Sequence, residues 1–213
     1  MPSAAVLTDF GSSLASKGSG TVCGLKLVPL AATTPGPAEV TKGDDIVDEA
    51  LAYLRTGTHH RKWVLDASSE ATLVYLLRFL GSCFQALASV ANAGEGSLVI
   101  KRLAFEPVAL PGERGFPADG VMEVPESRAA ADLCRSWLAQ ARAECGLRLL
   151  KVYFTDKGGV SAYWREVGAR STKFRTLFGT YSAPIEEEAA YKRNTTSSRS
   201  IEFRMPQDPP AAR

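Results

Sequence analysis

The apolar positions of this chain are densest between Thr72 and Val90, where they cover almost the whole circumference of a predicted helix. At about 100° per residue, the polar side chains of this segment fall within roughly one-sixth of the circumference. These side chains are Arg78, Ser82, Gln85 and Ser89. A helix with so narrow a polar stripe has to be enclosed, either by lipid or by other helices. Because a charged Arg78 near its middle would be costly in hydrocarbon, the pattern favours a core helix over a transmembrane one.

Capping residues mark where this central helix and an amphipathic helix before it begin. The earlier helix begins at Asp44 or Asp45, since a carboxylate there can accept hydrogen bonds from the first free N–H groups. It ends at Gly57, because glycine readily adopts the left-handed conformation that closes a helix. The central helix has its cap at Ser68 or Ser69.

A further helix is predicted from Ser127, its cap, to Gly146, which is expected to end it. Its apolar residues follow the helical period and define a buried side, and its charged and amide residues define a wet side. The buried side consists of Ala130, Leu133, Cys134, Trp137, Leu138, Ala141 and Cys145, and the wet side of Arg128, Asp132, Arg135, Gln140 and Arg142.

The remaining segments are shorter or less regular. Val22–Leu30 is a short β-type run, and Asn92–Gly96 is expected to break the helical pattern. Ser97–Phe105 and Leu147–Phe154 fit a helix or a strand equally well by period. Glu106–Pro125 is punctuated by proline and glycine, which predicts an extended loop.

Together these patterns predict an all-α fold, mainly helical with short extended segments, in which one buried central helix is surrounded by the other helices. Residues 1–20 are rich in Ser, Gly and Ala and are expected to form a flexible N-terminal arm. Residues 21–182 would form the helical domain. Residues 183–213, with an acidic run, a Ser/Thr cluster and prolines, are expected to be a disordered C-terminal tail.

Composition and motifs indicate a binding or scaffold protein without a metal or a cofactor. The net charge of +2, from 25 basic and 23 acidic residues, is too balanced to predict nucleic-acid binding. The four cysteines form no CxxC pair and are typical of small buried hydrophobes in a reducing compartment. His59 and His60 lack a third ligand at a recognisable metal-site spacing, and no nucleophile and base occur in a catalytic motif.

Two segments are candidates for contact with a partner protein. The stretch Arg165–Arg175 is the most basic of the chain, and it is either a solvated helix face or a contact for an acidic surface. Phe116, in the extended loop, either packs across its own domain or is offered to a partner. The candidate interface residues are Pro111, Phe116, Pro117, Trp164, Arg165, Arg170, Lys173 and Arg175.

Three blocks of sequence carry a family resemblance through their order and spacing. They are Gly36–Ala50, Leu110–Pro117 and Ala143–Leu150. Together they resemble the family of subunit 3, the 21 kDa subunit, of the actin-related protein 2/3 complex. With weaker matches between the blocks, the resemblance extends from about Gly20 to Phe178. Where the family tends to carry two adjacent tryptophans, this chain has Tyr163 and Trp164.

The resemblance implies a mostly helical fold with one enclosed helix, no catalytic activity and no bound cofactor. It implies packing against actin-related protein 3 and other subunits of the seven-subunit complex, and contact with actin filaments through that complex. The expected location is the cytoplasm and cytoskeleton, with neither nucleic acid nor a membrane span involved. The alternative function is a free-standing helical adaptor that binds an acidic protein through Arg165–Arg175.

Overall fold

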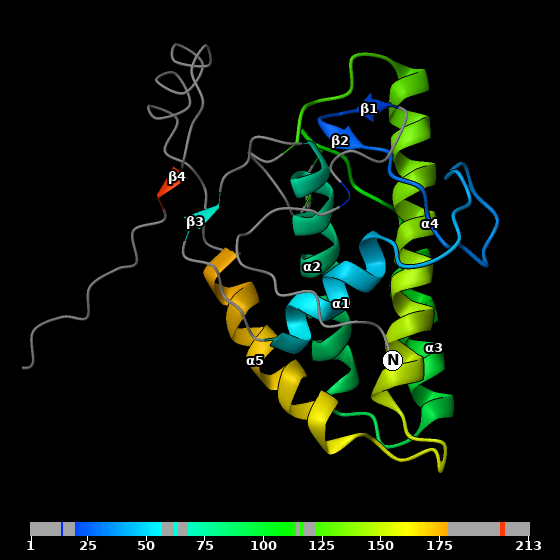
Figure 1. The fold of residues 1–213 in the computed structure, drawn as a ribbon, viewed down its shortest axis with the longest axis vertical. Helices are drawn as coiled ribbons and strands as arrows, with labels where there is room; N and C mark the ends of the chain where they lie inside the picture. Colours follow the sequence, from blue (N-terminus) through cyan, green and yellow to red (C-terminus); the bar gives the residue numbers. More distant parts are fainter. Residues whose placement is uncertain are drawn as a thin grey trace, which may run out of the picture.

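The described part of the chain is a bundle of helices, as Figure 1 shows, and the predicted mainly helical fold is confirmed. The computed structural model describes Leu14 and residues 20–56, 62–63, 68–113, 116, 122–178 and 201–202. The helices are α1 (Ile46–Thr56), α2 (Ser68–Leu87), α3 (Ala93–Phe105), α4 (Arg128–Tyr153) and α5 (Ala162–Phe178). The strands are β1 (Thr21–Val22), β2 (Leu25–Lys26), β3 (Lys62–Trp63) and β4 (Ile201–Glu202).

Helix α2 is the predicted central helix, and it contacts each of α1, α3, α4 and α5. Leu73, Leu76 and Leu80 have no exposed surface, which confirms that the apolar circumference is enclosed by the protein. The predicted polar stripe is the part of α2 that reaches solvent, with Arg78 half-buried and Gln85 exposed. Within the described residues, no helix has both the length and the hydropathy needed to cross a bilayer.

Helix α3 resolves the first ambiguous segment, since residues 97–105 are helical. Of the predicted break at Asn92–Gly96, only Asn92 lies outside a helix, and residues 93–96 form the first turn of α3. The Asn92 side chain accepts a hydrogen bond from the Glu95 N–H at 2.9 Å and so caps α3. Gly96 lies inside α3, where a Cβ atom would sit 2.6 Å from the Phe154 ring. This glycine allows close packing and does not end a helix.

Helix α4 is longer than the sequence predicts, because it continues through Gly146 to Tyr153. The predicted cap at its start is confirmed, since the Ser127 hydroxyl accepts a hydrogen bond from the Ala130 N–H at 3.1 Å. The predicted end at Gly146 is wrong. A Cβ atom at this position would lie 2.5 Å from Ile100 Cγ2, so the glycine allows α3 to pack closely against α4.

The predicted sides of α4 are mostly confirmed, with two exceptions. Cys134, Trp137 and Leu138 are completely buried, as the helical period predicts. Leu133, predicted to be buried, is 38 % exposed, and Gln140, predicted to be wet, is only 5 % exposed. The error at Gln140 arises because the 34–38 loop, which is distant in sequence, covers that side of α4, and the local pattern does not show this loop.

Helices α1 and α5 flank α2. The Asp45 carboxylate accepts hydrogen bonds from the N–H groups of Val47 and Asp48 at 2.9 and 3.3 Å, so the predicted cap of α1 is confirmed. Helix α5 runs through Gly168, where a Cβ atom would lie 2.7 Å from the Phe84 ring of α2. Gly168 is thus a third glycine, after Gly96 and Gly146, that allows close packing.

The strands are short. β1 and β2 pair antiparallel through a two-residue turn in which Cys23 and Gly24 have φ values of 55° and 72°, as a tight hairpin requires. This hairpin confirms a short β element within the predicted run 22–30. β3 pairs with β4, which lies in the predicted C-terminal tail. The boundaries of the arm, domain and tail otherwise stay a prediction, and His59 and His60 lie outside the described residues.

Candidate interaction surface

Two of the sequence blocks that carry the family resemblance meet in an ionic cluster between α4 and the segment before α1. The Arg148 guanidinium donates to both Asp45 oxygens at 2.6 and 2.7 Å and to the Ala31 carbonyl at 3.0 Å. Asp45 is fully buried and Arg148 nearly so, with side-chain exposures of 0 % and 15 %. Burial raises the pKa of the neighbouring Asp48, against the lowering effect of Arg148. This bidentate ion pair holds the start of α1 against α4.

One turn earlier on α4, Glu144 anchors the same segment. Its Oε1 accepts hydrogen bonds from the N–H groups of Thr33 and Thr34 at 2.7 and 2.8 Å, and from the Thr34 hydroxyl at 2.8 Å. Burial alone would raise the pKa of this carboxyl, but the hydrogen bonds from Thr34 and Thr33 outweigh it and lower the pKa. The spacing of Glu144 and Arg148 by one helical turn is the signal that sequence reasoning did not use.

Gln140 continues this row of polar contacts by another turn. Its amide nitrogen donates to the Thr34 carbonyl at 2.9 Å, and its oxygen accepts from the Ala38 N–H at 2.9 Å. Gly36 passes so close that a Cβ atom would collide with the Gln140 amide. Gln140 is thus buried because it serves the backbone of the 34–38 loop, as a buried amide must.

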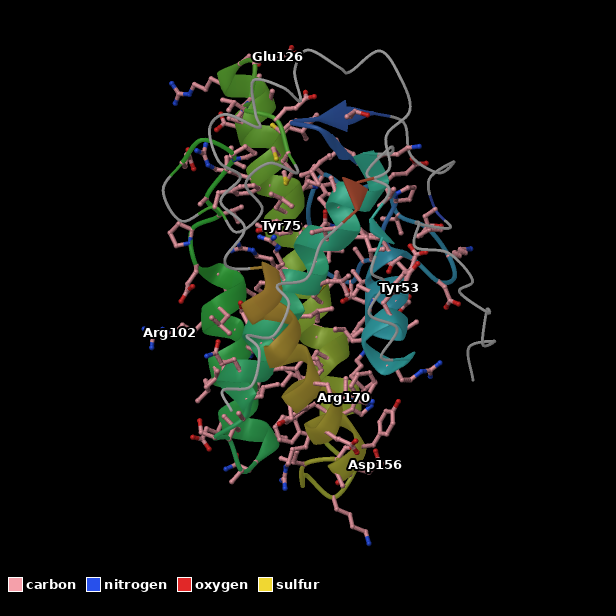
Figure 2. The ribbon with its side chains drawn as sticks, turned by 90° about the vertical axis from the view of Figure 1, so that its left-hand side faces the viewer. Tyr53, Tyr75, Arg102, Glu126, Asp156 and Arg170 are labelled. Carbon is pink, nitrogen blue, oxygen red and sulfur yellow. The ribbon has the colours of Figure 1, made fainter. Side chains whose placement is uncertain are left out.

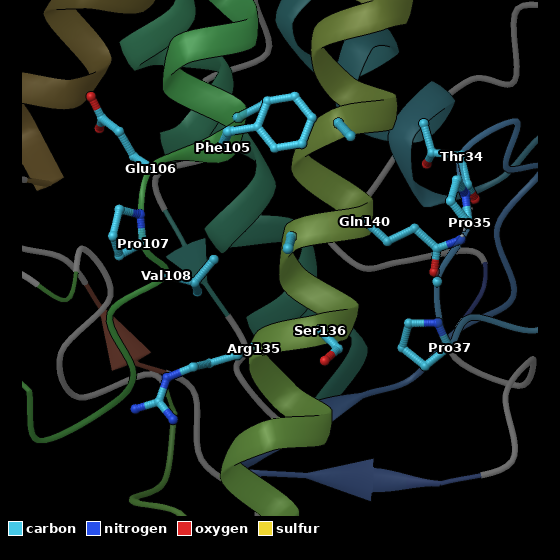
Figure 3. A pocket seen from close by; sticks show the side chains of 14 residues that line it. Thr34, Pro35, Pro37, Phe105, Glu106, Pro107, Val108, Arg135, Ser136 and Gln140 are labelled. Atoms are coloured by element: carbon cyan, nitrogen blue, oxygen red, sulfur yellow. Dashed lines mark hydrogen bonds between the residues drawn. The ribbon is translucent and has the colours of Figure 1, made fainter.

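The anchored loop forms one wall of a groove across α4, shown in Figure 3. The opposite wall is the end of α3 and the chain that follows it, and the floor is made by small residues of α4. The groove has a volume of about 550 Å³. Its main lining residues are Pro35, Pro37, Phe105, Pro107, Val108, Ser136, Ala139 and Ala143. Phe105 stands at the rim with 81 % of its surface exposed.

Of the three interface residues predicted in the extended loop, the two that the structure describes are buried by the chain itself. Pro111 is buried, and Phe116 is 5 % exposed and stacks on Tyr75 of α2, with 6.2 Å between ring centroids. Of the two alternatives for Phe116, packing across its own domain is the one observed. A partner contact by Pro111 or Phe116 stays a prediction, and Pro117 lies outside the described residues.

The predicted interface residues of α5 are more accessible. Trp164 is half-buried and stacks on Phe84, with 6.2 Å between ring centroids. Arg165 and Arg170 are exposed, and Arg170 is labelled in Figure 2. At about 100° per residue these two arginines point about 140° apart, so they do not form one patch. Lys173 and Arg175 lie in α5, outside the part whose side chains are described, and the role of all these residues in an interface stays a prediction.

Within the described residues, no group of three or more potential metal ligands is found. Three of the four cysteines are buried, as predicted: Cys83, Cys134 and Cys145. Burial raises the pKa of the Cys83 thiol to about 12, which leaves it protonated and unreactive at neutral pH. The fourth, Cys23, is half-buried in the hairpin turn.

The fold defines the class of the protein: a helical bundle with an enclosed core and with large apolar side chains, such as Leu98 and Phe105, exposed on an outer helix, where they are available for protein contacts. The family model described as the ARP2/3 complex ARPC3 (21 kDa) subunit, P21-Arc, matches residues 7–174. The chain therefore belongs to the family of actin-related protein 2/3 complex subunit 3.

Individual relatives agree with this family. The chain is 33 % identical to actin-related protein 2/3 complex subunit 3 of Arabidopsis thaliana over 144 residues, which are 67 % of this chain and 83 % of the relative. It is 33 % identical to the Dictyostelium discoideum protein of the same name, over 65 % of this chain and 80 % of the relative. It is 31 % identical to the probable subunit 3 of Caenorhabditis elegans, over 64 % and 75 % of the two chains.

Proposed function

We propose that this chain is a non-catalytic structural subunit of an actin-related protein 2/3 complex. In this role it packs against the actin-related subunits, actin-related protein 3 among them, and supports nucleation of actin filaments as branches on existing ones. The observation that carries the proposal is the family match over residues 7–174, which includes α1 to α4 and most of α5. The location that follows from this role is the cytoplasm and cytoskeleton.

The structure supports a role that depends on contact between the outer surface of the chain and other subunits. Nine-tenths or more of each large apolar side chain of α2 from Leu73 to Leu87 is already buried inside the chain, so α2 has no apolar surface left for a partner. Contact with other subunits must therefore use the outer helices and loops. A stable subunit interface buries about 800 Å² on each partner, which needs a continuous part of that outer surface.

The proposal is tested by co-purification with a tagged actin-related protein 3 from cells that express this chain. The expected result is recovery of the chain at near equal stoichiometry with the tagged subunit after gel filtration. A matched control is the chain with Leu80→Asp, which places a charge in the core and is expected to be absent from the complex. Failure to recover the wild-type chain would contradict the proposal.

A second candidate is a free-standing adaptor for an acidic protein, favoured by the exposure of Arg165 and Arg170 on α5. The variant with Arg170→Glu, Lys173→Glu and Arg175→Glu separates the two functions. An adaptor of this kind loses its acidic partner with its folding unchanged, measured by circular dichroism. Unchanged binding of that partner by the folded variant removes the candidate.

A further inference from the structure

The outer face of α3 carries two of the most exposed large apolar side chains in the described part of the molecule. Leu98 is 71 % exposed and Phe105 is 81 % exposed. They lie seven residues apart, which is two helical turns, so both point from the same side of α3. Exposed apolar side chains that are aligned on one face are typical of a protein contact, whereas single scattered ones are not.

The packing of α3 on α4 fixes this exposure. The inner face of α3 is buried through Gly96, Ile100 and Ala104. Gly96 lies against the Phe154 ring and Ile100 against Gly146, with no room for a Cβ atom at either glycine. Since the helices are in contact at these points, α3 cannot rotate to bury Leu98 and Phe105 within the monomer.

Two cations lie between these apolar residues. Lys101 and Arg102 are exposed on the same side of α3, and Figure 2 shows Arg102 pointing away from the other helices. Within the described residues neither cation has a carboxylate partner. The acidic residues of this region, Glu95 and Glu106, lie at the two ends of α3, so its middle is positive. By contrast, the cation beside the groove, Arg135, is already paired with Glu113 and Asp132.

The exposed face continues into the groove described above. Phe105 belongs to both, as the end of the α3 face and as part of the groove's rim. Ala139 and Ala143 of α4 line the groove, and their small side chains leave room for the side chains of a partner. Together the α3 face (Leu98, Lys101, Arg102 and Phe105) and the groove form one continuous strip, of which the helix between Leu98 and Phe105 alone makes about 10 Å.

We infer that the α3 face and the adjoining groove dock a segment of a neighbouring subunit that carries apolar side chains with carboxylates between them. The apolar side chains cover Leu98 and Phe105 and enter the groove, and the carboxylates pair with Lys101 and Arg102. Charge complementarity selects this occupant, because the middle of the face is unbalanced and the partner has to neutralise it. The inference rests on the proposed function, since it names the surface through which the subunit is held.

The test uses the full chain and the remaining subunits of the complex, purified without subunit 3. Binding of the wild-type chain to this assembly is compared with that of two double variants. One is Leu98→Ser with Phe105→Ser, and the other is Lys101→Glu with Arg102→Glu. Each variant is expected to bind roughly tenfold more weakly or worse, because a desolvated contact centre carries most of the binding energy. For the charge-reversed variant, the loss should shrink at high salt.

Matched controls change equally exposed residues elsewhere. Val40→Ser removes an apolar side chain that is 72 % exposed on the loop before α1, and Lys157→Glu reverses an exposed charge in the turn before α5. Both are expected to bind as the wild type does. All variants are checked for an unchanged thermal transition.

The outcomes separate the inference from the function it rests on. If the wild type binds the assembly and the variant with Leu98→Ser and Phe105→Ser binds equally well, the inference is wrong and the proposed function is unaffected. If only the variant with Leu98→Ser and Phe105→Ser binds more weakly, the partner segment does not carry the proposed carboxylates. A wild-type chain that does not bind the assembly overturns the proposed function itself.

Discussion

Helices α2 and α3 are adjacent in sequence and in contact in space, yet their apolar residues meet opposite surroundings. Leu80 of α2 has no exposed surface, because the chain's own helices surround it. Leu98 of α3 is 71 % exposed, because only the inner face of α3 is covered. The same residue type therefore stabilises the monomer in one helix and is left for association in the other.

The difference follows from how many sides of each helix are covered. Full burial of a leucine contributes about 1.5–3 kcal/mol to folding, and a leucine left in water contributes almost none of this. An exposed leucine gains the same free energy only when a partner covers it. Apolar content alone does not distinguish the two situations, but the position of each helix in the bundle does.

The comparison breaks most clearly at Leu80. We expect Leu80→Ala to lower the free energy of unfolding by about 2–5 kcal/mol, since it removes buried methyl groups and leaves a cavity. Denaturant unfolding followed by circular dichroism measures this loss. A loss under 1 kcal/mol would show that the surroundings of α2 relax into the space, contrary to an enclosed helix.

The close contact of α3 with α4 provides the next largest effect. Gly146→Ala would place a methyl group 2.5 Å from Ile100 Cγ2, whereas Gly94→Ala in the first turn of α3 meets nothing closer than 3.4 Å. We expect Gly94→Ala to gain up to about 1 kcal/mol from helix propensity. Gly146→Ala should fall below it by about 1–3 kcal/mol because of overpacking.

A double variant identifies the cause. Ile100→Ala removes the Cγ2 methyl group that a methyl group at position 146 would meet, whereas Ile100→Val would keep it. The double variant Gly146→Ala/Ile100→Ala should therefore lose less stability than the sum of the two single losses, because the space left at position 100 accommodates the added methyl group. Equal unfolding free energies for Gly146→Ala and Gly94→Ala would contradict the close approach of the two helices.

These glycines also show what the sequence can and cannot predict. The enclosed α2 and the caps Asp45 and Ser127 were predictable, because each depends on residues that are near in sequence. Gly146 was misread, since a glycine that ends a helix and one that allows another helix to approach look alike in one sequence. The second use depends on Ile100, which is distant along the chain.

The candidate surface was less predictable for the same reason. The helical period predicts that Gln140 is exposed to solvent. Its burial is explained by the 34–38 loop, which is distant in sequence. Leu98 and Phe105 fall in a segment whose period did not distinguish helix from strand, so their shared face could not be recognised. The interface residues predicted on α5 were chosen because this segment is rich in basic residues. An excess of basic residues does not show that Arg165 and Arg170 point in different directions from the helix.

Acid should weaken the anchor that holds the groove wall, with a smaller effect than the substitutions in the core. Because hydrogen bonds lower the folded pKa of Glu144, its contribution to stability is present above the unfolded pKa of about 4.3 and is lost as pH falls through the folded pKa. We expect Glu144→Gln to cost about 1–2 kcal/mol at neutral pH. The difference in free energy of unfolding between the wild type and Glu144→Gln should become smaller as the pH falls from 5 to 3, a range that includes the unfolded pKa.

The pH dependence of the wild type alone does not isolate Glu144, because the contribution of Asp48 to stability changes with pH in the opposite direction. The wild type is therefore compared with Glu144→Gln at each pH. Burial raises its folded pKa, so its contribution to stability is greatest below its unfolded pKa and is lost as pH rises through the folded pKa. The total stability of the wild type therefore mixes the two carboxyls. A difference between the wild type and Glu144→Gln that stays constant with pH would show that Glu144 is not held as a charged acceptor.

The smallest effect on stability is expected on the outer face of α3, and it completes the comparison with Leu80. Leu98→Ala changes the same residue type in the same way, but it should alter the free energy of unfolding by less than about 0.5 kcal/mol, because the side chain is exposed in the monomer. Denaturant unfolding of Leu80→Ala and Leu98→Ala under identical conditions measures the contrast. A loss at Leu98 as large as that at Leu80 would mean that the chain itself covers the α3 face, and that this face is not available to another subunit.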